Sequence, residues 1–245
     1  MNIDKFLETV IQSDISKHKG FLTQVIRPAI DILKDENSQP YLGCSRFGGA
    51  PDLPAGTEWP TYNMKPYRFI GQINFSEITS TETGLPKSGL LSLFVVDDSE
   101  GECYLETWDE GYIHAIFTPE TTNLETIVPP NSIVGKATVI EFSPTIDIPY
   151  DEYQVKNWPF DEEENDIYSE IRESLHKSSD YLLGYPSHCT LAYDPTPGTE
   201  WISLLTISSD DNLEWCWHDG DKLMVFIQRE HLKNLDFSSL KADAG

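Results

Sequence analysis

One stretch of the sequence, EWCWHDGD, pairs residue types that could support nucleophilic catalysis. Cys216 and His218 lie two residues apart, so on an extended strand they share one face while Trp215 and Trp217 share the other. A histidine can hold the cysteine thiolate that attacks a substrate. Neighbours on one face of a single strand usually stand too far apart for a direct hydrogen bond, however. We therefore name no catalytic residue.

Carboxylates gather in two loops of the C-terminal part, at Asp210, Asp211, Asp219 and Asp221. Oxygen-rich loops suit calcium or magnesium. The spacing of a calcium-binding loop is absent, and aspartates in turns commonly accept hydrogen bonds from their own backbone. We expect solvated turn carboxylates, with no metal and no cofactor, and keep His218 and Asp219 as candidate binding residues.

Two amides, Gln72 and Asn74, alternate with the apolar Ile73 and Phe75 on an expected strand. If the amide side faces the interior, these groups must be hydrogen-bonded and would fix how strands cross. If it faces a groove, they would recognise a ligand. The sequence favours the structural interpretation, because most side-chain amides bond to backbone.

The span CSRFGGAPDLPAGTEWP, residues 44–60, could be a ligand cradle or a folding device. Gly48 and Gly49 permit positive φ, and Pro51 and Pro54 remove amide donors that a phosphate-binding loop would use. The spacing of a phosphate-binding loop is also absent. We predict a structural turn. Candidate binding residues in this turn and a similar later one are Arg46, Trp59 and Tyr185.

Charge limits the partners of this chain. It has 17 Lys and Arg against 41 Asp and Glu, a formal net charge of −24. Such a surface repels phosphate backbones, so nucleic acid is a poor partner, whereas a basic protein is electrostatically favoured. No apolar stretch is long enough to span a membrane. Four dispersed cysteines without a C-x-x-C pair indicate a reduced cytoplasm.

The elements that must position these residues are mostly short strands. Helical spacing predicts a helix over about 3–14 and another over 166–177. Residues 21–33 are expected to form an edge or bulged strand around Pro28. Further strands are expected over 67–75, 90–96, 103–108, 112–117, 200–208 and 212–227, the last as a hairpin turning at Asp219-Gly220.

A turn, a Trp-led strand and a second apolar strand occur twice in the same order, in pseudo-repeats of about 41–145 and 180–240. We predict a single domain over 1–245. Its fold class is α+β, mainly antiparallel β, with two intertwined, structurally similar halves made by internal duplication and a few peripheral helices.

The ordered motifs SRFGGAPDLPAGTEWP, YRFIGQINFSEI, LGYPSHCTLAYDP and HDGDKLMVFIQREHLKNLDFSSL resemble those of the YwqG-like family of bacterial proteins of unknown function. The resemblance covers about residues 41–240 and implies one largely β fold of two similar halves. It also implies a distant similarity to eukaryotic proteins that escort ribosomal proteins and support ribosomal RNA maturation. It supplies no catalytic residues. Leu183 and Thr190 depart from the pattern, where glycine and glutamine are common.

These observations favour a cytoplasmic, non-catalytic protein-interaction module that binds a basic protein partner, as a monomer or weak dimer. The alternative is a metal-assisted hydrolase or RNA-processing-related enzyme that uses the Asp-rich loops.

Overall fold

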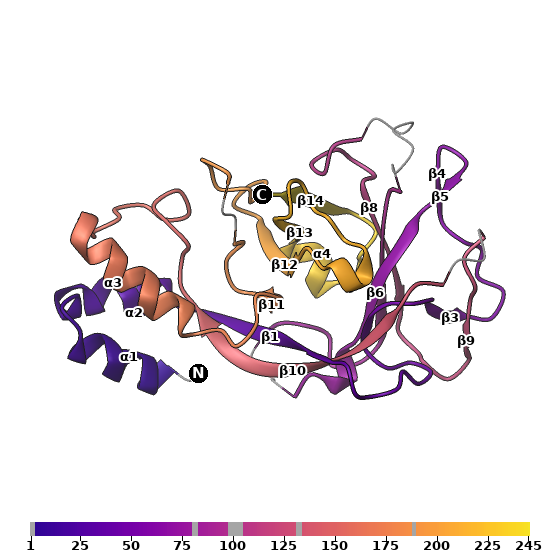
Figure 1. The fold of residues 1–245 in the computed structure, drawn as a ribbon, viewed down its shortest axis with the longest axis horizontal. Coiled ribbons are helices and arrows are strands. Elements are labelled where there is room, and N and C mark those ends of the chain that lie inside the picture. The colour runs from indigo at the N-terminus through magenta and orange to yellow at the C-terminus, as the bar shows by residue number, and fades with distance from the viewer. Residues whose placement is uncertain (1–2, 80–82, 98–104, 131–133, 188–189) are drawn as a thin grey trace.

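The computed structural model describes residues 3–79, 83–97, 105–130, 134–187 and 190–245 (Figure 1). In these residues one antiparallel sheet of 10 strands has the order β14-β13-β12-β11-β1-β10-β2-β6-β7-β8. Its strands are β1 (Arg27–Asp35), β2 (Arg46–Gly48), β6 (Arg68–Asn74), β7 (Leu90–Val95), β8 (Ile113–Thr118), β10 (Ala137–Asp147), β11 (Tyr181–Leu183), β12 (Trp201–Ser208), β13 (Lys222–Gln228) and β14 (Leu240–Ala244). The expected fold class, mainly antiparallel β, is confirmed.

Two small sheets flank the large one. They pair β3 (Asp52–Pro54) with β9 (Leu124–Thr126) and β4 (Thr61–Tyr62) with β5 (Lys65–Pro66).

The large sheet curls until its first and last strands, β14 and β8, lie against each other (Figure 1). Phe237, just before β14, packs at this seam: its ring centroid lies 4.9 Å from that of Phe117 in β8 and 6.0 Å from that of Phe75. The sheet is therefore nearly closed, and the outer edges of β8 and β14 cover each other.

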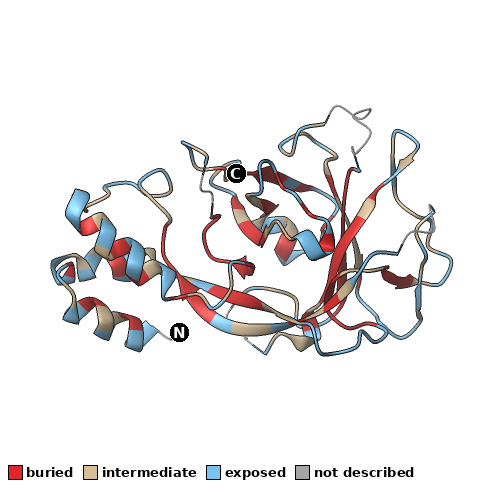
Figure 2. Ribbon diagram, in the orientation of Figure 1, coloured by how far each residue is buried: buried red, intermediate tan, exposed pale blue. Residues whose placement is uncertain are grey.

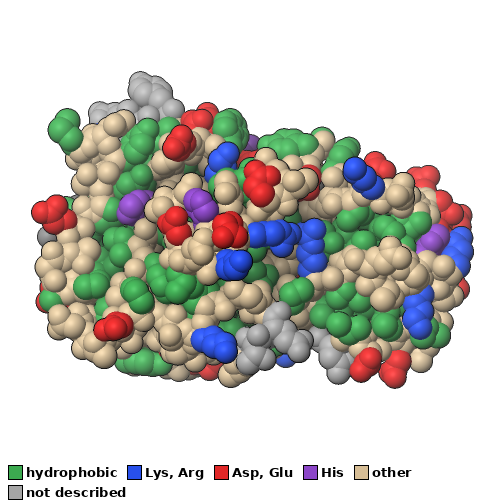
Figure 3. Space-filling view, turned by 180° about the vertical axis from the view of Figure 1, so that it is seen from behind, with side chains coloured by type: hydrophobic (Ala, Val, Ile, Leu, Met, Phe, Trp, Pro, Cys, Tyr) green, Lys and Arg blue, Asp and Glu red, His purple; other side chains and the backbone are tan. Residues whose placement is uncertain are grey.

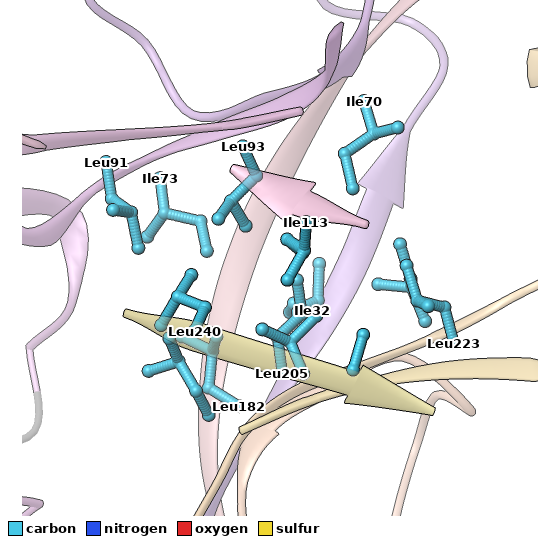
Figure 4. Close-up of a cluster of buried hydrophobic side chains, with 14 of the residues drawn as sticks. Ile32, Ile70, Ile73, Leu91, Leu93, Ile113, Leu182, Leu205, Leu223 and Leu240 are labelled. Carbon is cyan, nitrogen blue, oxygen red and sulfur yellow. The ribbon is translucent and has the colours of Figure 1, made fainter. Parts of the chain in front are cut away.

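The interior of the curled sheet is the main hydrophobic core. Aliphatic side chains from strands far apart in sequence, such as Ile32, Leu93, Leu205 and Leu240, point toward one another there (Figure 4). Because alternate residues of a strand face opposite sides, each strand supplies part of this core. Figure 2 accordingly shows buried residues along the strands and exposed residues on the outer faces of the helices.

Strands β1 and β10 are longer than their other neighbours and extend beyond the curled part of the sheet to a helical unit (Figure 1). That unit contains α1 (Ile3–Gln12), η1 (Ser16–His18), α2 (Lys19–Val25) and α3 (Glu162–Glu173). A second core of residues from these helices and from the end of β10 holds it together, with Phe6, Tyr168 and Ile148 fully or almost fully buried. The short helices η2 (Phe75–Glu77), η3 (Asp211–Leu213) and α4 (Arg229–Lys233) lie elsewhere along the sheet.

Helix α3 begins with a capping box. Asp161 Oδ1 accepts from the Glu164 N–H at 3.0 Å, and Glu164 Oε2 accepts from the Asp161 N–H at 3.3 Å. Glu164 also binds Lys17 at 2.6 Å and His18 at 3.0 Å, and these contacts hold its pKa at about 2. The acidic start of the predicted helix is thus used to attach α3 to η1.

The predicted helix over 3–14 is confirmed by α1. The expected strand over 21–33 is wrong in its first part, because residues 19–25 form α2 and only Arg27 onward is extended. β1 is also a central strand rather than an edge. Pro28 is tolerated because the side on which it lacks an N–H faces the end of β11, where its carbonyl still accepts from the Gly184 N–H at 3.1 Å.

The predicted hairpin at Asp219-Gly220 is wrong. β13 begins at Lys222 and pairs with β12 and β14, while the segment before the turn makes a single isolated bridge, between Asp210 and Trp215. The reason is burial: the rings of Trp215 and Trp217 enter the main core, which draws this segment away from β13.

Of the strand expected over 103–108, residues 103 and 104 lie outside the described residues and 105–108 are not extended. The internal duplication stays a prediction. Among the described residues, no helix is both long and apolar enough to cross a membrane.

Candidate functional site

The predicted binding residue Arg46 lies in a buried polar network beneath the Gly-Pro span. Its Nη1 donates to Asp52 Oδ2 at 2.6 Å, and its Nη2 donates to the carbonyl of Ala50. Gln72 Nε2 donates to Asp52 Oδ2 at 3.0 Å, and Gln72 Oε1 accepts from the Asp52 N–H at 2.9 Å. The side chains of Arg46 and Asp52 are only 5% and 1% exposed. This network joins β2, β3 and β6 inside the protein.

Asp52 is held ionised by its neighbours. Burial raises the pKa of this carboxyl, but hydrogen bonds from Arg46, the Gly43 N–H and Thr126 Oγ1 outweigh burial and lower the pKa overall. Asn74 is likewise engaged: its Nδ2 donates to the Gly43 carbonyl at 2.8 Å, and its Oδ1 accepts from the Ser76 N–H at 3.1 Å. Both predicted amides therefore bond to protein groups, and Gln72 faces the interior rather than a groove.

The two glycines of the span are required by close packing. Gly48 has φ +65°, and a Cβ there would lie 2.2 Å from the Lys136 carbonyl oxygen. Gly49 has φ +74°, and a Cβ there would lie 2.8 Å from Ala137 Cβ. Only glycine accommodates both the left-handed backbone and this approach to β10. These positions agree with the prediction of a structural turn.

Trp59 lines a cleft of about 570 Å³ between this turn and η3. Its Nε1 donates to the Tyr67 carbonyl at 2.9 Å. Arg68 Nη2 crosses the cleft and donates to the carbonyls of Leu213 and Glu214, each at 2.9 Å. The charged residues that line the cleft are Arg68, Lys136, Asp97 and Glu214, so their formal charges cancel. The cleft therefore gives no electrostatic preference for a charged ligand.

Tyr185 is part of a second buried network, which sequence reasoning missed. Its N–H donates to Asp147 Oδ2 at 2.8 Å, and its hydroxyl donates to the Val25 carbonyl at 2.8 Å. The guanidinium of Arg27 lies 3.7 Å from its ring centroid. A Cβ on Gly184 would lie 2.6 Å from Asp147 Oδ2, so the turn must pass close to this carboxylate. Tyr185 is 3% exposed, and both of these hydrogen bonds are to protein groups.

The centre of the second network is His176, just after α3. It lies between two buried carboxylates, Asp31 of β1 and Asp147 of β10, with Nδ1 2.7 Å from Asp31 and Nε2 3.2 Å from Asp147. Arg172 Nη2 lies 3.6 Å from Asp147, and its Nε donates to the Ile148 carbonyl at 3.1 Å. The network therefore anchors the end of α3 to the paired strands β1 and β10.

His218 and Asp219 lie on the surface turn before β13. His218 Nδ1 lies 3.2 Å from Asp221 Oδ2, and the Asp219 side chain is 93% exposed. Cys216 Sγ lies 3.6 Å from the backbone carbonyl of His218 rather than from its ring. Asp210 caps η3 and pairs with Lys34 at 2.6 Å. Ser209 joins the two acidic loops, because its N–H and Oγ donate to the Asp221 carbonyl at 2.9 and 3.0 Å. Among the described residues no cluster of His, Cys, Asp and Glu is arranged to hold a metal ion.

A groove with a different charge runs along the outer side of β10. We call it the β10 groove; its volume is about 520 Å³ and it is lined by Ser38, Gln39, Tyr41, Cys44, Glu77, Val139, Ile140, Glu141 and Phe142. It contains two glutamates and neither lysine nor arginine. Its walls come from the segment that links β1 to β2, from η2 and from β10. Cys44 and Glu77 fall within stretches singled out in the sequence, but nothing in those stretches indicates a groove, since its parts meet only through the fold.

Tyr41 is the aromatic residue on the outer wall of the groove. Its side chain is 63% exposed, and its hydroxyl donates to Glu77 Oε1 at 2.9 Å. This hydrogen bond to a carboxylate raises the pKa of Tyr41. The other oxygen, Glu77 Oε2, accepts from the Ser45 N–H at 3.0 Å. Glu77 therefore fixes the tyrosine in place and keeps a negative charge beside it.

Fold and site together define a mainly antiparallel β protein with a nearly closed sheet and a helical unit carried by β1 and β10. Buried ionic networks join β2, β3 and β6 to one another and α3 to β1 and β10. A sequence model of the family DUF1963, described as a domain of unknown function, matches residues 45–243, and the chain belongs to that family. No curated protein gives a significant match. In chain order the matched range covers β2 to β13 and all but the last residue of β14, and it includes five of the nine residues that line the β10 groove. β1 and Tyr41 lie outside it.

Proposed function

We propose that this protein is a cytoplasmic, non-catalytic interaction module that binds a basic segment of another protein in the β10 groove. The observation that carries the proposal is the charge of the groove: its lining holds Glu77 and Glu141 and no cation. The cleft beside Trp59 lacks this asymmetry. A groove of one charge in a chain of net charge −24 attracts positive partners and speeds their association.

Net charge alone does not select a surface. On the face shown in Figure 3, acidic side chains are scattered, and a small group of Lys and Arg lies near the middle. A partner that followed only the overall charge would find no unique place on this face. The β10 groove supplies one, because a concave surface concentrates the field of its carboxylates.

Tyr41 adds an anchor to this charge. Tyrosines are enriched at binding surfaces because they bring a large contact area with few rotatable bonds. The hydrogen bond to Glu77 orders the ring before a partner arrives, which lowers the entropy cost of binding. An Arg or Lys of the partner could stack on the ring and pair with Glu141, which is exposed.

Within the DUF1963 family we infer that the chain is YwqG-like, on the ordered motifs of its sequence. The twofold occurrence of a turn, a Trp-led strand and a second apolar strand supports the internal duplication of that family. We expect the protein to act as a monomer or weak dimer.

The test uses a fluorescent peptide of alternating Lys and Val, with an alternating Glu and Val peptide as its acidic counterpart. We expect the basic peptide to bind and the acidic one not to, with weaker binding at higher salt. The substitution Glu141→Lys should weaken binding about tenfold or more, because it reverses an exposed charge in the groove. Fluorescence anisotropy measures both effects.

Glu170→Lys is the matched control, because Glu170 is exposed on α3, far along the chain from the groove, and the substitution changes the net charge equally. We expect it to change affinity by less than about twofold. Equal effects of the two substitutions would show that only net charge matters, and no preference for the basic peptide would overturn the proposal.

A further inference from the structure

The nearly closed sheet has an opening in its strand pairing along β10. On one side β10 pairs with β1 from Val139 to Asp147, but on the other side it pairs with β2 only from Ala137 to Val139. One further bond follows, from the Ile140 N–H to the Ser45 carbonyl at 3.2 Å. Beyond it, no described strand pairs with that side of β10.

The separation of β2 from β10 has a local cause. The Cys44 N–H donates to the Tyr41 carbonyl at 3.1 Å, which turns the chain away just before β2. Glu77 holds this turn by accepting from the Ser45 N–H. The β10 groove lies where the two segments diverge, and residues 139–142 line it on the β10 side.

Backbone groups of a strand point alternately to its two sides. Because the Ile140 N–H points toward β2, the N–H and C=O of Phe142 point to the same, open side. Pro144 follows with a carbonyl and no N–H. The segment after α3 reaches β10 at Ser143 and Thr145: Lys177 Nζ donates to Ser143 Oγ at 3.2 Å, and Thr145 Oγ1 donates to the Leu175 carbonyl at 2.7 Å. The open stretch is residues 141–144, about 13 Å long at ~3.3 Å per residue.

We propose that the basic segment binds by strand addition: it lies extended in the β10 groove and pairs antiparallel with β10 in line with β2. This inference rests on the proposed function and specifies its binding mode. The Phe142 N–H and C=O and the Pro144 C=O form the backbone bonds. Glu141 and Glu77 neutralise the segment's cationic side chains, and Tyr41 contacts one of them.

Two features limit what can bind. The short length of the opening admits about four residues in register, and Pro144 blocks a second backbone donor, so long apolar strands gain little there. The carboxylates discriminate against acidic segments. The occupant is therefore a short extended segment with Lys or Arg at alternate positions, because alternate side chains of a strand face the same way.

Strand pairing uses the N–H groups of alternate residues of the incoming segment, which permits a sharp test. Two Lys-Val peptides are made with N-methyl groups on every second residue, one on the lysines and one on the valines. Both carry the same charge and the same number of methyl groups. We expect one peptide to lose at least about tenfold in affinity and the other to keep most of it.

Amide hydrogen exchange gives the protein-side result. The Phe142 N–H should become protected on binding of the unmethylated peptide, whereas amides of α3 should not change. Tyr41→Ala should weaken binding, and because Tyr41 is 63% exposed the variant should stay folded. Glu141→Lys, measured in the same peptide-binding experiment, shows how far affinity depends on the charge of the groove.

The outcomes separate the two proposals. If the basic peptide binds with Glu141 dependence but both methylated peptides bind equally, strand addition is wrong and the charge-based function stands. If the unmethylated peptide binds no better than the acidic one, the proposed function fails and strand addition with it. If only one of the two methylated peptides loses affinity, and the Phe142 N–H becomes protected from exchange, both the proposed function and strand addition are supported.

Discussion

Nδ1 of His176 lies 2.7 Å from Oδ1 of Asp31, and both side chains are at least nine-tenths buried. The opposite ring nitrogen faces Asp147, whose carboxylate is also near Arg172. The two buried carboxylates therefore have two cationic partners: Arg172, which is always charged, and His176, which is charged only when protonated. The formal charges balance only when the imidazole is protonated, since a buried ion is costly unless it is paired.

The first prediction concerns the pH dependence of stability. Burial lowers the pKa of His176, but the carboxylates of Asp147 and Asp31 outweigh burial and raise its pKa overall. Its contribution is then full below the unfolded histidine pKa of about 6.5 and is lost as pH rises through the folded pKa. His176→Gln should lower the free energy of unfolding by on the order of 3 kcal/mol at acidic pH, and by less at basic pH.

Urea unfolding of the wild type and His176→Gln across pH measures this difference. His218→Gln, which removes a half-exposed imidazole at the surface, controls for the loss of a histidine as such. The charge-balance account is contradicted if the difference in unfolding free energy between wild type and His176→Gln is the same below pH ~6.5 as at basic pH.

The second prediction concerns the network beneath the Gly-Pro span. Arg46→Met leaves Asp52 buried without its cation, which should cost about 3–5 kcal/mol of unfolding free energy. Thr126→Val removes one neutral donor from the same carboxylate and should cost only about 1 kcal/mol. Chemical denaturation gives both values, and the reverse order of costs would show that the ion pair does not stabilise this region.

Gly48 and Gly56 allow the structural turn to be tested with a matched pair. Both have positive φ, +65° and +80°, but a Cβ on Gly56 would meet nothing within 4 Å whereas one on Gly48 would meet the Lys136 carbonyl at 2.2 Å. Gly56→Ala should therefore cost about 1–2 kcal/mol from backbone strain alone. Gly48→Ala should cost clearly more, because β2 must move away from β10. Equal costs in thermal unfolding would refute the packing argument.

The sequence predicts the strands that carry a local signal. Residues 67–75, 90–96, 112–117 and 200–208 contain compact apolar runs, and β6, β7, β8 and β12 lie there. The sequence does not predict β10, because its residues mix polar groups with Pro144 and have no clear alternation. It forms because β1 and β2 supply partners from much earlier in the chain. Local patterns cannot show such pairing.

The candidate sites show the same limit. Gln72 and Asn74 were singled out by their alternation, but only the fold shows that Gln72 meets Asp52 in the interior. The groove residues Tyr41, Glu77 and Glu141 lie on three separate segments. Glu77 falls within the motif YRFIGQINFSEI, but nothing in that motif marks it as a groove residue, and Tyr41 and Glu141 belong to none of the quoted motifs. The predicted hairpin at Asp219-Gly220 does not form, because burial of Trp215 and Trp217 in the main core outweighs a strong turn signal.

The closure of the sheet gives the last prediction. Phe237 is 3% exposed and packs against Phe117 and Phe75 at the seam between β8 and β14. Phe237→Ala should lower the free energy of unfolding by about 3–5 kcal/mol. It should also speed amide exchange most in β8 and β14. Phe6→Ala, which empties a comparable site in the helical unit, should be similarly destabilising without this local effect. Because no β8–β14 hydrogen-bond ladder is present among the described residues, side-chain packing must hold the seam. Exchange that rises evenly over all strands in Phe237→Ala would show that the seam is held in another way.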